Sequence, residues 1–456
     1  MQESQIKIIP RLKKESVMKV GLMALSGVRV RNEKLVKLGV TLPQFVSRGN
    51  VIAQLPSLSL LIIASVTPDD VEVDYVEVPD VSEVMELNPG YDLVAITSYS
   101  AQIHEAYELA DRYRKAGIPV IIGGTHVIAE PKEAQGHADS VAIGEAEVLW
   151  PKIMADFKDN RLQPLYKEEH PATYDLSSSP IPRYDLLATE NYNRITVQTS
   201  RGCPHDCEFC AGSKLFGQGF RQKPVGLIVR EIEKIKQKWP KPFIEFADDN
   251  TFVDKKWSRD FLKALIPLKV KWFTETDISV AEDEGLLKLM YKSGCYQLLI
   301  GLESTSKDSL DGIDTHNWKL KQRDRYLDAV HRIQSNGVTV NGCFVIGLDG
   351  DTPDIFKDIT DFIEKSRLLE AQVTVLTPYP GTRLYRRLRQ EGRLLKDQFW
   401  DRCTMFDLNF KPKNMTPKDL EEGLLWIFGE IYNEKEYLKR KRHYMDIIKT
   451  LPKRRK

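Results

Sequence analysis

The sequence predicts an α/β protein with a doubly wound parallel sheet, a partial (β/α)6 barrel and a helical C-terminal segment. Short apolar runs alternate with stretches of helical spacing through most of the chain, which is the pattern of successive βα units. With 456 residues the chain is also long enough for about two to three domains. We expect domains over residues 1–165, 191–385 and 386–456, joined by a linker over 166–190.

Composition and charge exclude several classes of protein. A hydrophobic content of 42% and a charged content of 29% are ordinary for a soluble protein, and a net charge of +1 gives no reason to expect nucleic acid as a partner. The longest apolar run, residues 58–66, is far shorter than the ~20 residues of a membrane helix. The N-terminus does not resemble a secretory signal. We therefore expect a cytoplasmic protein without a membrane span, in which clustered cysteines favour a metal over disulfides.

The first half of the chain has the order of a Rossmann-like fold. Strict alternation over residues 71–78 predicts an edge strand, whereas the other apolar runs predict buried parallel strands. We expect the remaining strands at 19–26, 93–97, 120–123 and 141–143, with helices over 58–65 and 103–116. Ligands of such sheets bind at the carboxyl ends of the strands.

Small and glycine residues follow three of these expected strands. They are Thr97, Ser98, Gly123, Gly124, Gly144 and Glu145. Glycine lets the backbone approach a ligand closely, but it also makes ordinary tight turns, and both interpretations stay open. For His126, a turn histidine bonded to the backbone is a better interpretation than a metal ligand.

These strand ends resemble the N-terminal domain of cobalamin-binding radical S-adenosylmethionine enzymes. The resemblance is carried by Leu55-Pro56-Ser57-Leu58, Gly123-Gly124-Thr125-His126, Pro131-Lys132-Glu133, Asp139 and Gly144-Glu145-Ala146-Glu147. Ala146 departs from the family, which usually has glycine there. The Asp-x-His-x-x-Gly loop of other cobalamin proteins is absent, as is usual in this family. The resemblance implies that cobalamin contacts Thr97, Ser98, Gly123, Gly124, Gly144 and Glu145.

A connector precedes a second series of strand–helix units. Pro180 and Pro182 exclude a helix interior and place the domain boundary near residue 190. Strands are expected at 195–199, 243–247, 272–276, 297–302, 338–346 and 373–377, and helices at 225–238, 258–267, 284–293, 319–336 and 353–367. Six units predict a partial TIM-like barrel with its site on the loops after the strands.

Three cysteines follow the first barrel strand with the spacing Cys203-x3-Cys207-x2-Cys210. Thiolates are soft ligands for iron–sulfur clusters or zinc, and three of them leave one position of a four-coordinate metal open. Zinc with His205 as the fourth ligand is the competing hypothesis, but structural zinc sites usually draw on two separate ligand pairs. Carboxylates and small residues follow the later strands, where each could instead cap a helix.

The cysteine spacing and its place after the first strand resemble the radical S-adenosylmethionine superfamily. The resemblance implies that the cysteines hold three irons of a 4Fe–4S cluster and that the fourth iron binds S-adenosylmethionine. By position, Asp248 and Asp249 match the residues that bind the amino group of this cofactor, with Glu275 on the next strand. Glu303 and Ser304 match residues near its ribose and carboxylate, whereas the backbones of Phe209, Gly347 and Pro378 match positions beside its adenine.

The remaining cysteines and the C-terminal segment carry weaker signals. We expect Cys295 and Cys343 to be small buried hydrophobic residues and leave Cys403 without a role. Residues 386–456 are expected to form polar helices whose basic runs are solvated rather than bound to nucleic acid. Five aromatic residues are expected to pack this segment over the barrel mouth: Trp400, Phe406, Phe410, Trp426 and Phe428.

The leading functional hypothesis is a radical enzyme that holds cobalamin above the cluster. It would methylate an unactivated carbon or phosphorus centre of a small molecule, with electrons from an external donor such as flavodoxin or ferredoxin. Transfer of a 3-amino-3-carboxypropyl group is one alternative. Another is hydrogen abstraction for a rearrangement or cyclisation, in which the first domain is only structural. The non-enzymatic alternative is an iron–sulfur electron-transfer module, which would not need the polar strand ends.

Overall fold

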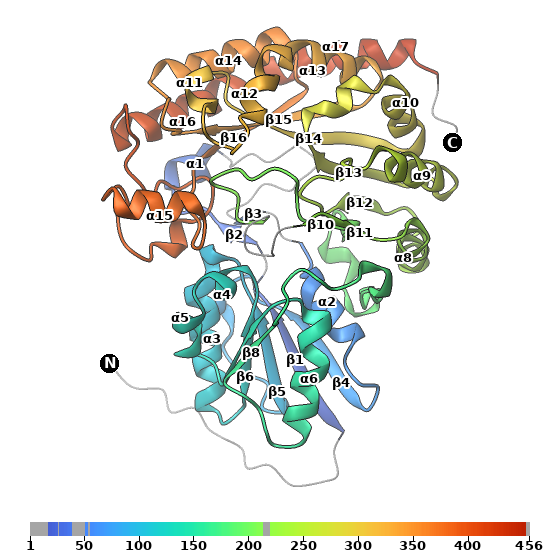
Figure 1. Cartoon of the computed structure of the whole chain (residues 1–456), viewed down its shortest axis with the longest axis vertical. Helices are drawn as coiled ribbons and strands as arrows, with labels where there is room; N and C mark the ends of the chain where they lie inside the picture. The colour runs from blue at the N-terminus through green and yellow to red at the C-terminus, as the bar shows by residue number, and fades with distance from the viewer. Residues whose placement is uncertain (1–16, 26, 39–50, 53–54, 213–218, 453–456) are drawn as a thin grey trace.

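The computed structural model describes residues 17–25, 27–38, 51–52, 55–212 and 219–452. Figure 1 shows two α/β units, with the first sheet and its helices below and the second above. The C-terminal helices lie along the outside of the upper unit. This arrangement of two parallel sheets and a helical C-terminal region confirms the predicted fold class.

The first sheet has six parallel strands in the order β4-β1-β5-β6-β7-β8. Their bounds are β1 Met18–Ala24, β4 Val71–Glu77, β5 Leu93–Thr97, β6 Val120–Gly123, β7 Ser140–Ile143 and β8 Leu165–Lys167. The alternating strand β4 lies at an edge, as its pattern predicts. Because β1 lies between β4 and β5, the winding reverses there, which is where doubly wound sheets bind ligands. Strand β8 extends this sheet two residues past the boundary expected at 165.

Helices cover both faces of the first sheet. They are α2 Leu58–Ser65, α3 Ile103–Lys115, α4 Thr125–Ala129, α5 Pro131–Gln135 and α6 Ala146–Lys158. Helix α6 continues through Pro151 to Lys158. A proline inside a helix costs about 3 kcal/mol. Burial of Leu149, Trp150, Ile153 and Met154 against the sheet offsets that cost.

The second sheet has six parallel strands in chain order, β9-β12-β13-β14-β15-β16 from one edge to the other. Their bounds are β9 Ile195–Val197, β12 Phe243–Phe246, β13 Lys271–Thr276, β14 Cys295–Glu303, β15 Thr339–Ile346 and β16 Glu370–Val375. In the part of the chain that the structure describes, β9 and β16 are not paired. The partial barrel is therefore open, as six rather than eight units predict.

The helices of this unit pack outside its strands. They are α8 Val225–Lys238, α9 Lys255–Leu265, α10 Glu284–Ser293, α11 Lys307–Leu310, α12 Trp318–Gln322, α13 Tyr326–Ser335 and α14 Asp354–Ser366. Two separate two-stranded antiparallel sheets are also present: β2 Val28–Arg29 with β3 Val51–Ile52, and β10 Ser200–Arg201 with β11 Arg221–Gln222. Among the described residues, no helix has the length and hydropathy to cross a membrane.

The C-terminal segment contacts both units. The helices of this segment are α15 Arg383–Gln390, α16 Pro417–Ile431 and α17 Glu434–Thr450. The N-terminal helix α1, Glu33–Leu38, contacts α16. Trp400 joins the core of the first unit, whereas Phe406, Phe410 and Phe428 join the core of the second. The prediction that Trp426 packs inward is wrong, because 45% of its surface is exposed.

Candidate functional site

The cysteine loop leaves the hairpin strand β10 through a glycine that no other residue could replace easily. Gly202 has φ +86°, and a Cβ there would lie 2.2 Å from the carbonyl oxygen of Gly219. Cys203, Cys207 and Cys210 follow, all as free thiols. Burial raises the pKa of Cys203 to about 11 and that of Cys207 to about 12, and the charge of Cys210 adds to both shifts. The three thiols therefore share one neighbourhood.

Residues between the cysteines hold the loop to the rest of the barrel. The backbone N–H of Glu208 donates to the carbonyl oxygen of Ile313 at 2.7 Å, and the carbonyl of Glu208 accepts from the N–H of Leu384 at 3.2 Å. The Arg387 side chain donates to the Glu208 carboxylate at 2.6 Å. Thr315 bonds to Asp206 through both its backbone and its hydroxyl. The cysteine positions are thus fixed by protein contacts.

The zinc hypothesis finds no support at His205. Its Nε2 lies 3.2 Å from the carboxylate of Asp277, and its ring lies 4.2 Å from that of Trp318. Within the described ranges, no three His, Cys, Asp or Glu side chains converge on one ion. A 4Fe–4S cluster does not require that convergence, since each cysteine binds a different iron. Three free thiols on one braced loop fit such a cluster.

The two aspartates after β12 have different surroundings. Asp248 is buried and accepts hydrogen bonds from the backbone N–H groups of Thr199 and Ser200, at 2.7 and 2.8 Å, and from the hydroxyl of Thr251. Asp249 has an exposed side chain beside Gly212. The protein that surrounds its carboxylate and the charge of Asp248 raise the pKa of Asp249, whereas a backbone hydrogen bond from Gly202 lowers it. Asp248 therefore has a structural role, whereas Asp249 is available to a ligand.

Glu275 on β13 is an unpaired carboxylate in the barrel. It makes no hydrogen bond or ion pair within the described residues, and its side chain is exposed. Surrounding protein and the neighbouring carboxylates, of which Glu245 has the largest effect, raise the pKa of Glu275 to about 8. A carboxylate without a protein partner among the described residues could receive a cationic or hydrogen-bond-donating ligand.

Glu303 at the end of β14 is paired with a lysine. Lys319 Nζ lies 2.8 Å from the Glu303 carboxylate and 2.6 Å from the carbonyl oxygen of Gly301. A Cβ on Gly301 would meet the Glu303 carboxylate at 2.3 Å. Burial opposes the charge of Lys319, but Glu303 and Cys207 raise its pKa. Lys319 therefore lies beside both the predicted cofactor residue and the cysteine loop.

The other predicted barrel contacts are mostly enclosed. Ser304 is buried, and its hydroxyl accepts the N–H of Ser306 at 3.1 Å. Gly347 has φ +94°, and a Cβ there would meet Phe410. Pro378 is buried after β16, and Phe209 packs partly buried against the barrel core. Their contacts with adenine stay predictions.

The first sheet presents small residues at its carboxyl edge. Gly124 has φ +111°, and a Cβ there would lie 2.8 Å from the Thr97 hydroxyl. The Ser98 hydroxyl donates to the Tyr99 carbonyl at 2.9 Å, and Gly123 ends β6 next to Ala142. Small side chains and a hydroxyl at the winding reversal fit a large ligand that approaches the backbone closely.

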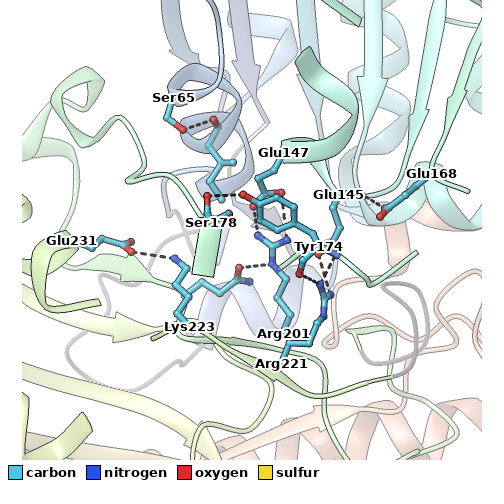
Figure 2. A network of polar contacts seen from close by, with 12 residues as sticks. Ser65, Glu145, Glu147, Glu168, Tyr174, Ser178, Arg201, Arg221, Lys223 and Glu231 are labelled. Carbon is cyan, nitrogen blue, oxygen red and sulfur yellow. Dashed lines mark hydrogen bonds and ion pairs between the residues drawn. The ribbon is translucent and has the colours of Figure 1, made fainter. Parts of the chain in front are cut away.

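Gly144 and Glu145, at the end of β7, serve protein contacts. A Cβ on Gly144 would clash with Glu168, whose carboxylate accepts the N–H of Glu145 at 2.9 Å. Both oxygens of Glu145 accept hydrogen bonds from arginines of the β10–β11 hairpin (Figure 2). Burial opposes the charge of Glu145, but Arg221 and Arg201 hold its pKa below the usual value.

The structure brings together further residues that no sequence motif indicated. Arg201 and Arg221 bind the first unit, and Lys319 lies at the cluster loop. Tyr99, directly after Ser98, has 54% of its surface exposed, yet Glu245 in the barrel raises its pKa in addition to the dominant effect of burial. His126 is buried in α4 and lies 3.0 Å from the Ser100 hydroxyl, so it is bonded to a side chain rather than to the backbone.

The three cysteines outside the loop differ in their burial. Cys295 is fully buried, as predicted. Cys343 is only half-buried, and the charges of Glu275 and Glu303 add to burial in raising its pKa, so it faces the barrel interior. Cys403 is buried beside Trp400 in the core of the first unit.

Three family models match this chain. The model of the Radical SAM superfamily covers residues 197–363, that of the B12 binding domain covers 47–153, and a domain of unknown function (DUF4070) covers 382–456. The first matched range contains the cysteine loop and most of the barrel, and the second contains most of the first sheet.

Similar proteins share both units. Bacteriochlorophyllide d C-8(2)-methyltransferase of Chlorobaculum tepidum is 27% identical over 84% of this chain and 87% of its own length. Hopanoid C-2 methylase of Rhodopseudomonas palustris is 27% identical over 76% of this chain and 67% of its own length. The structure of the radical S-adenosylmethionine methyltransferase TsrM of Kitasatospora setae, with cobalamin and a [4Fe-4S] cluster bound, aligns with a TM-score of 0.66 at 14% identity, over 92% of this chain and 90% of that one.

Proposed function

Because the chain belongs to the radical S-adenosylmethionine superfamily and carries a B12-binding domain, we propose that it is a cobalamin-dependent methyltransferase. Its acceptor would be an unactivated carbon or phosphorus centre of a small molecule. Relatives whose names specify methylation of a carbon atom support the reaction class. The acceptor itself is not identified by any residue of the site.

The observation that supports the proposal is that segments next to the two expected cofactor sites lie close together. Glu145 follows a strand of the first sheet and contacts Arg201, which lies two residues before Cys203. Tyr99 follows another strand of the first sheet and is within electrostatic reach of Glu245 in the barrel. A methyl carrier on the first sheet would therefore lie opposite the cluster loop, with the substrate between them.

The residues of this chain would bind and orient the cofactors. When bound, the cluster supplies the electron that cleaves S-adenosylmethionine, and cobalamin supplies the methyl carrier. Cys203, Cys207 and Cys210 would hold three irons, and Asp249 would bind the cofactor's amino group while Asp248 supports the backbone. Glu303 and Ser304 would lie near its ribose and carboxylate.

The other predicted cofactor contacts differ in which cofactor they could reach. We propose that Thr97, Ser98, Gly123 and Gly124 contact cobalamin, because they form the small-residue edge. Glu275 is free to contact either S-adenosylmethionine or the substrate. The backbones of Phe209, Gly347 and Pro378 would lie beside adenine. We further propose a cytoplasmic location, with flavodoxin or ferredoxin as the electron donor.

One anaerobic incubation tests the reaction class. The chain is reconstituted with iron, sulfide and cobalamin, mixed with reductant and S-adenosylmethionine, and its products are separated. S-adenosylhomocysteine together with 5′-deoxyadenosine supports the proposal. Methylthioadenosine would indicate aminocarboxypropyl transfer, and 5′-deoxyadenosine alone would indicate hydrogen abstraction. The control is the Cys207→Ala variant, which should form none of these products.

A further inference from the structure

Four charged residues, two buried glutamates and two half-buried arginines, connect the first unit to the hairpin that carries the cysteine loop (Figure 2). Arg201 donates from one terminal nitrogen to Glu145 and from the other to Glu147, each at 2.5 Å. Arg221 donates to both oxygens of Glu145, each at 3.0 Å. Two cations thus neutralise two anions across the boundary between the units. We call Glu145, Glu147, Arg201 and Arg221 the interdomain clamp.

The clamp joins segments that matter for both cofactor sites. Glu145 lies two residues after β7, at the carboxyl edge of the first sheet, and Glu147 lies in the first turn of α6, which follows. Arg201 is the last residue of β10 and pairs with Arg221 of β11, so its backbone leads straight into Cys203. Arg221 also donates to the backbone carbonyl of Tyr174 in the linker at 2.8 Å. One set of contacts therefore fixes the sheet edge, the linker and the loop.

Burial makes the geometry of the clamp restrictive. The side chains of Arg201 and Glu147 are only 13% and 3% exposed. Charges that are removed from water must keep their partners, because a single unpaired charge in the interior is strongly destabilising. The planar guanidinium of Arg201 has its Nε bonded to Gln198 and its two terminal nitrogens bonded to different carboxylates. Few relative orientations of the two units satisfy all these contacts.

We propose that the interdomain clamp positions the cysteine loop against the B12-binding domain and sets the separation of the two cofactors. This inference rests on the proposed function, in which cobalamin and the cluster act on one substrate between them. Arg201 and Glu147 are positioning residues, since among the described residues their side chains bond to Gln198, to Glu145 and to each other rather than to the cysteines or the small-residue edge. Their effect passes through the backbone from Arg201 to Cys203.

A spectroscopic measurement tests the clamp directly. The fully reconstituted chain is reduced so that the cluster and Co(II) cobalamin each carry an unpaired electron, and their magnetic coupling is recorded by electron paramagnetic resonance. Wild-type protein should show one defined coupling. Arg201→Lys keeps the charge but loses the forked geometry, and Glu147→Gln removes one anion. Both variants should bind the two cofactors in wild-type amounts yet lose the defined coupling.

The matched control is another buried ion pair in the same neighbourhood. Lys223 follows the same hairpin and lies 3.1 Å from Glu231 of α8, with both side chains 2% exposed, but this pair lies within the barrel. Glu231→Gln should lower the melting temperature and keep the wild-type coupling. The proposal would be overturned if Arg201→Lys and Glu147→Gln kept the wild-type magnetic coupling, or if Glu231→Gln lost that coupling to the same extent. A wild-type chain that binds no cobalamin would instead overturn the proposed function on which the clamp rests.

Discussion

The carboxylate of Asp248 accepts the backbone N–H of Thr199 at 2.7 Å, so the end of β12 holds the chain that leads to the cysteine loop. The neighbouring N–H of Ser200 shares the same carboxylate oxygen. Asp249, one residue later, has an exposed side chain, and the backbone N–H of Gly202 is the one backbone group that lowers its pKa. Adjacent aspartates thus divide support and ligand binding between them.

Asp248→Ala should destabilise the chain and reduce cluster assembly. It leaves two buried N–H groups without an acceptor, which costs about 1 to 3 kcal/mol for each group. Asp249→Ala should leave unfolding nearly unchanged and weaken S-adenosylmethionine binding. Urea unfolding and calorimetric titration with S-adenosylmethionine measure the two effects. Equal stability of the two variants would contradict this division of roles.

Lys319→Met should destabilise the chain because it leaves the carboxylate of Glu303 buried without its cation. Breaking a buried ion pair on one side costs about 3 to 5 kcal/mol. Adding Glu303→Gln should recover much of that loss, since no buried charge then remains unpaired. The free energy of unfolding of the single and double variants is the measurement. A double variant less stable than Lys319→Met would argue against the pairing.

The stability of the cofactor-free chain should fall as the pH rises, in part because of Glu275. Its pKa rises from 4.5 to about 8 on folding, so the folded state favours the protonated carboxyl. The stabilisation is complete below about pH 4.5 and is lost as the pH rises through about 8. Glu275→Gln should flatten this decline, as judged from urea midpoints at several pH values. An unchanged pH slope in the variant would show that Glu275 titrates normally.

Two glycines of helix α16 should respond in opposite ways to alanine. A Cβ on Gly423 would lie 2.2 Å from the Phe356 ring of α14, so Gly423→Ala should force the helices apart and cost about 1 to 3 kcal/mol. Gly429 has nothing within 4 Å of an added Cβ. Gly429→Ala should therefore stabilise the helix by about 0.5 to 1 kcal/mol. Thermal unfolding compares the two variants, and destabilisation by both would refute the packing argument.

The strands of both sheets and the cysteine loop were predictable because each is marked by a pattern within a few consecutive residues. Buried parallel strands are short apolar runs, so all six barrel strands were expected within a few residues of their observed bounds. The loop was predictable because Cys203, Cys207 and Cys210 lie close together in sequence. The side of β15 on which Cys343 lies was not predictable, because an apolar run does not show which residues face a polar barrel interior.

Contacts between distant segments could not be predicted in the same way. Arg201 and Glu145 are 56 residues apart and pair only because the two units dock. No sequence motif indicates Lys319, and its pairing with the Glu303 carboxylate is known only from the distance between them. The Gly144-Glu145-Ala146-Glu147 stretch was visible, but its carboxylates had no identified partner until the hairpin was placed beside them.

The most direct test of the account is the electron paramagnetic resonance spectrum of the reduced, iron-reconstituted chain with and without S-adenosylmethionine. If the three cysteines leave one iron open for this cofactor, the wild-type chain should give a 4Fe–4S signal whose g values change when S-adenosylmethionine is added. The signal should be lost when Cys203, Cys207 and Cys210 are all replaced by alanine. A cluster signal that S-adenosylmethionine leaves unchanged, or one that persists without the three cysteines, would contradict the central claim.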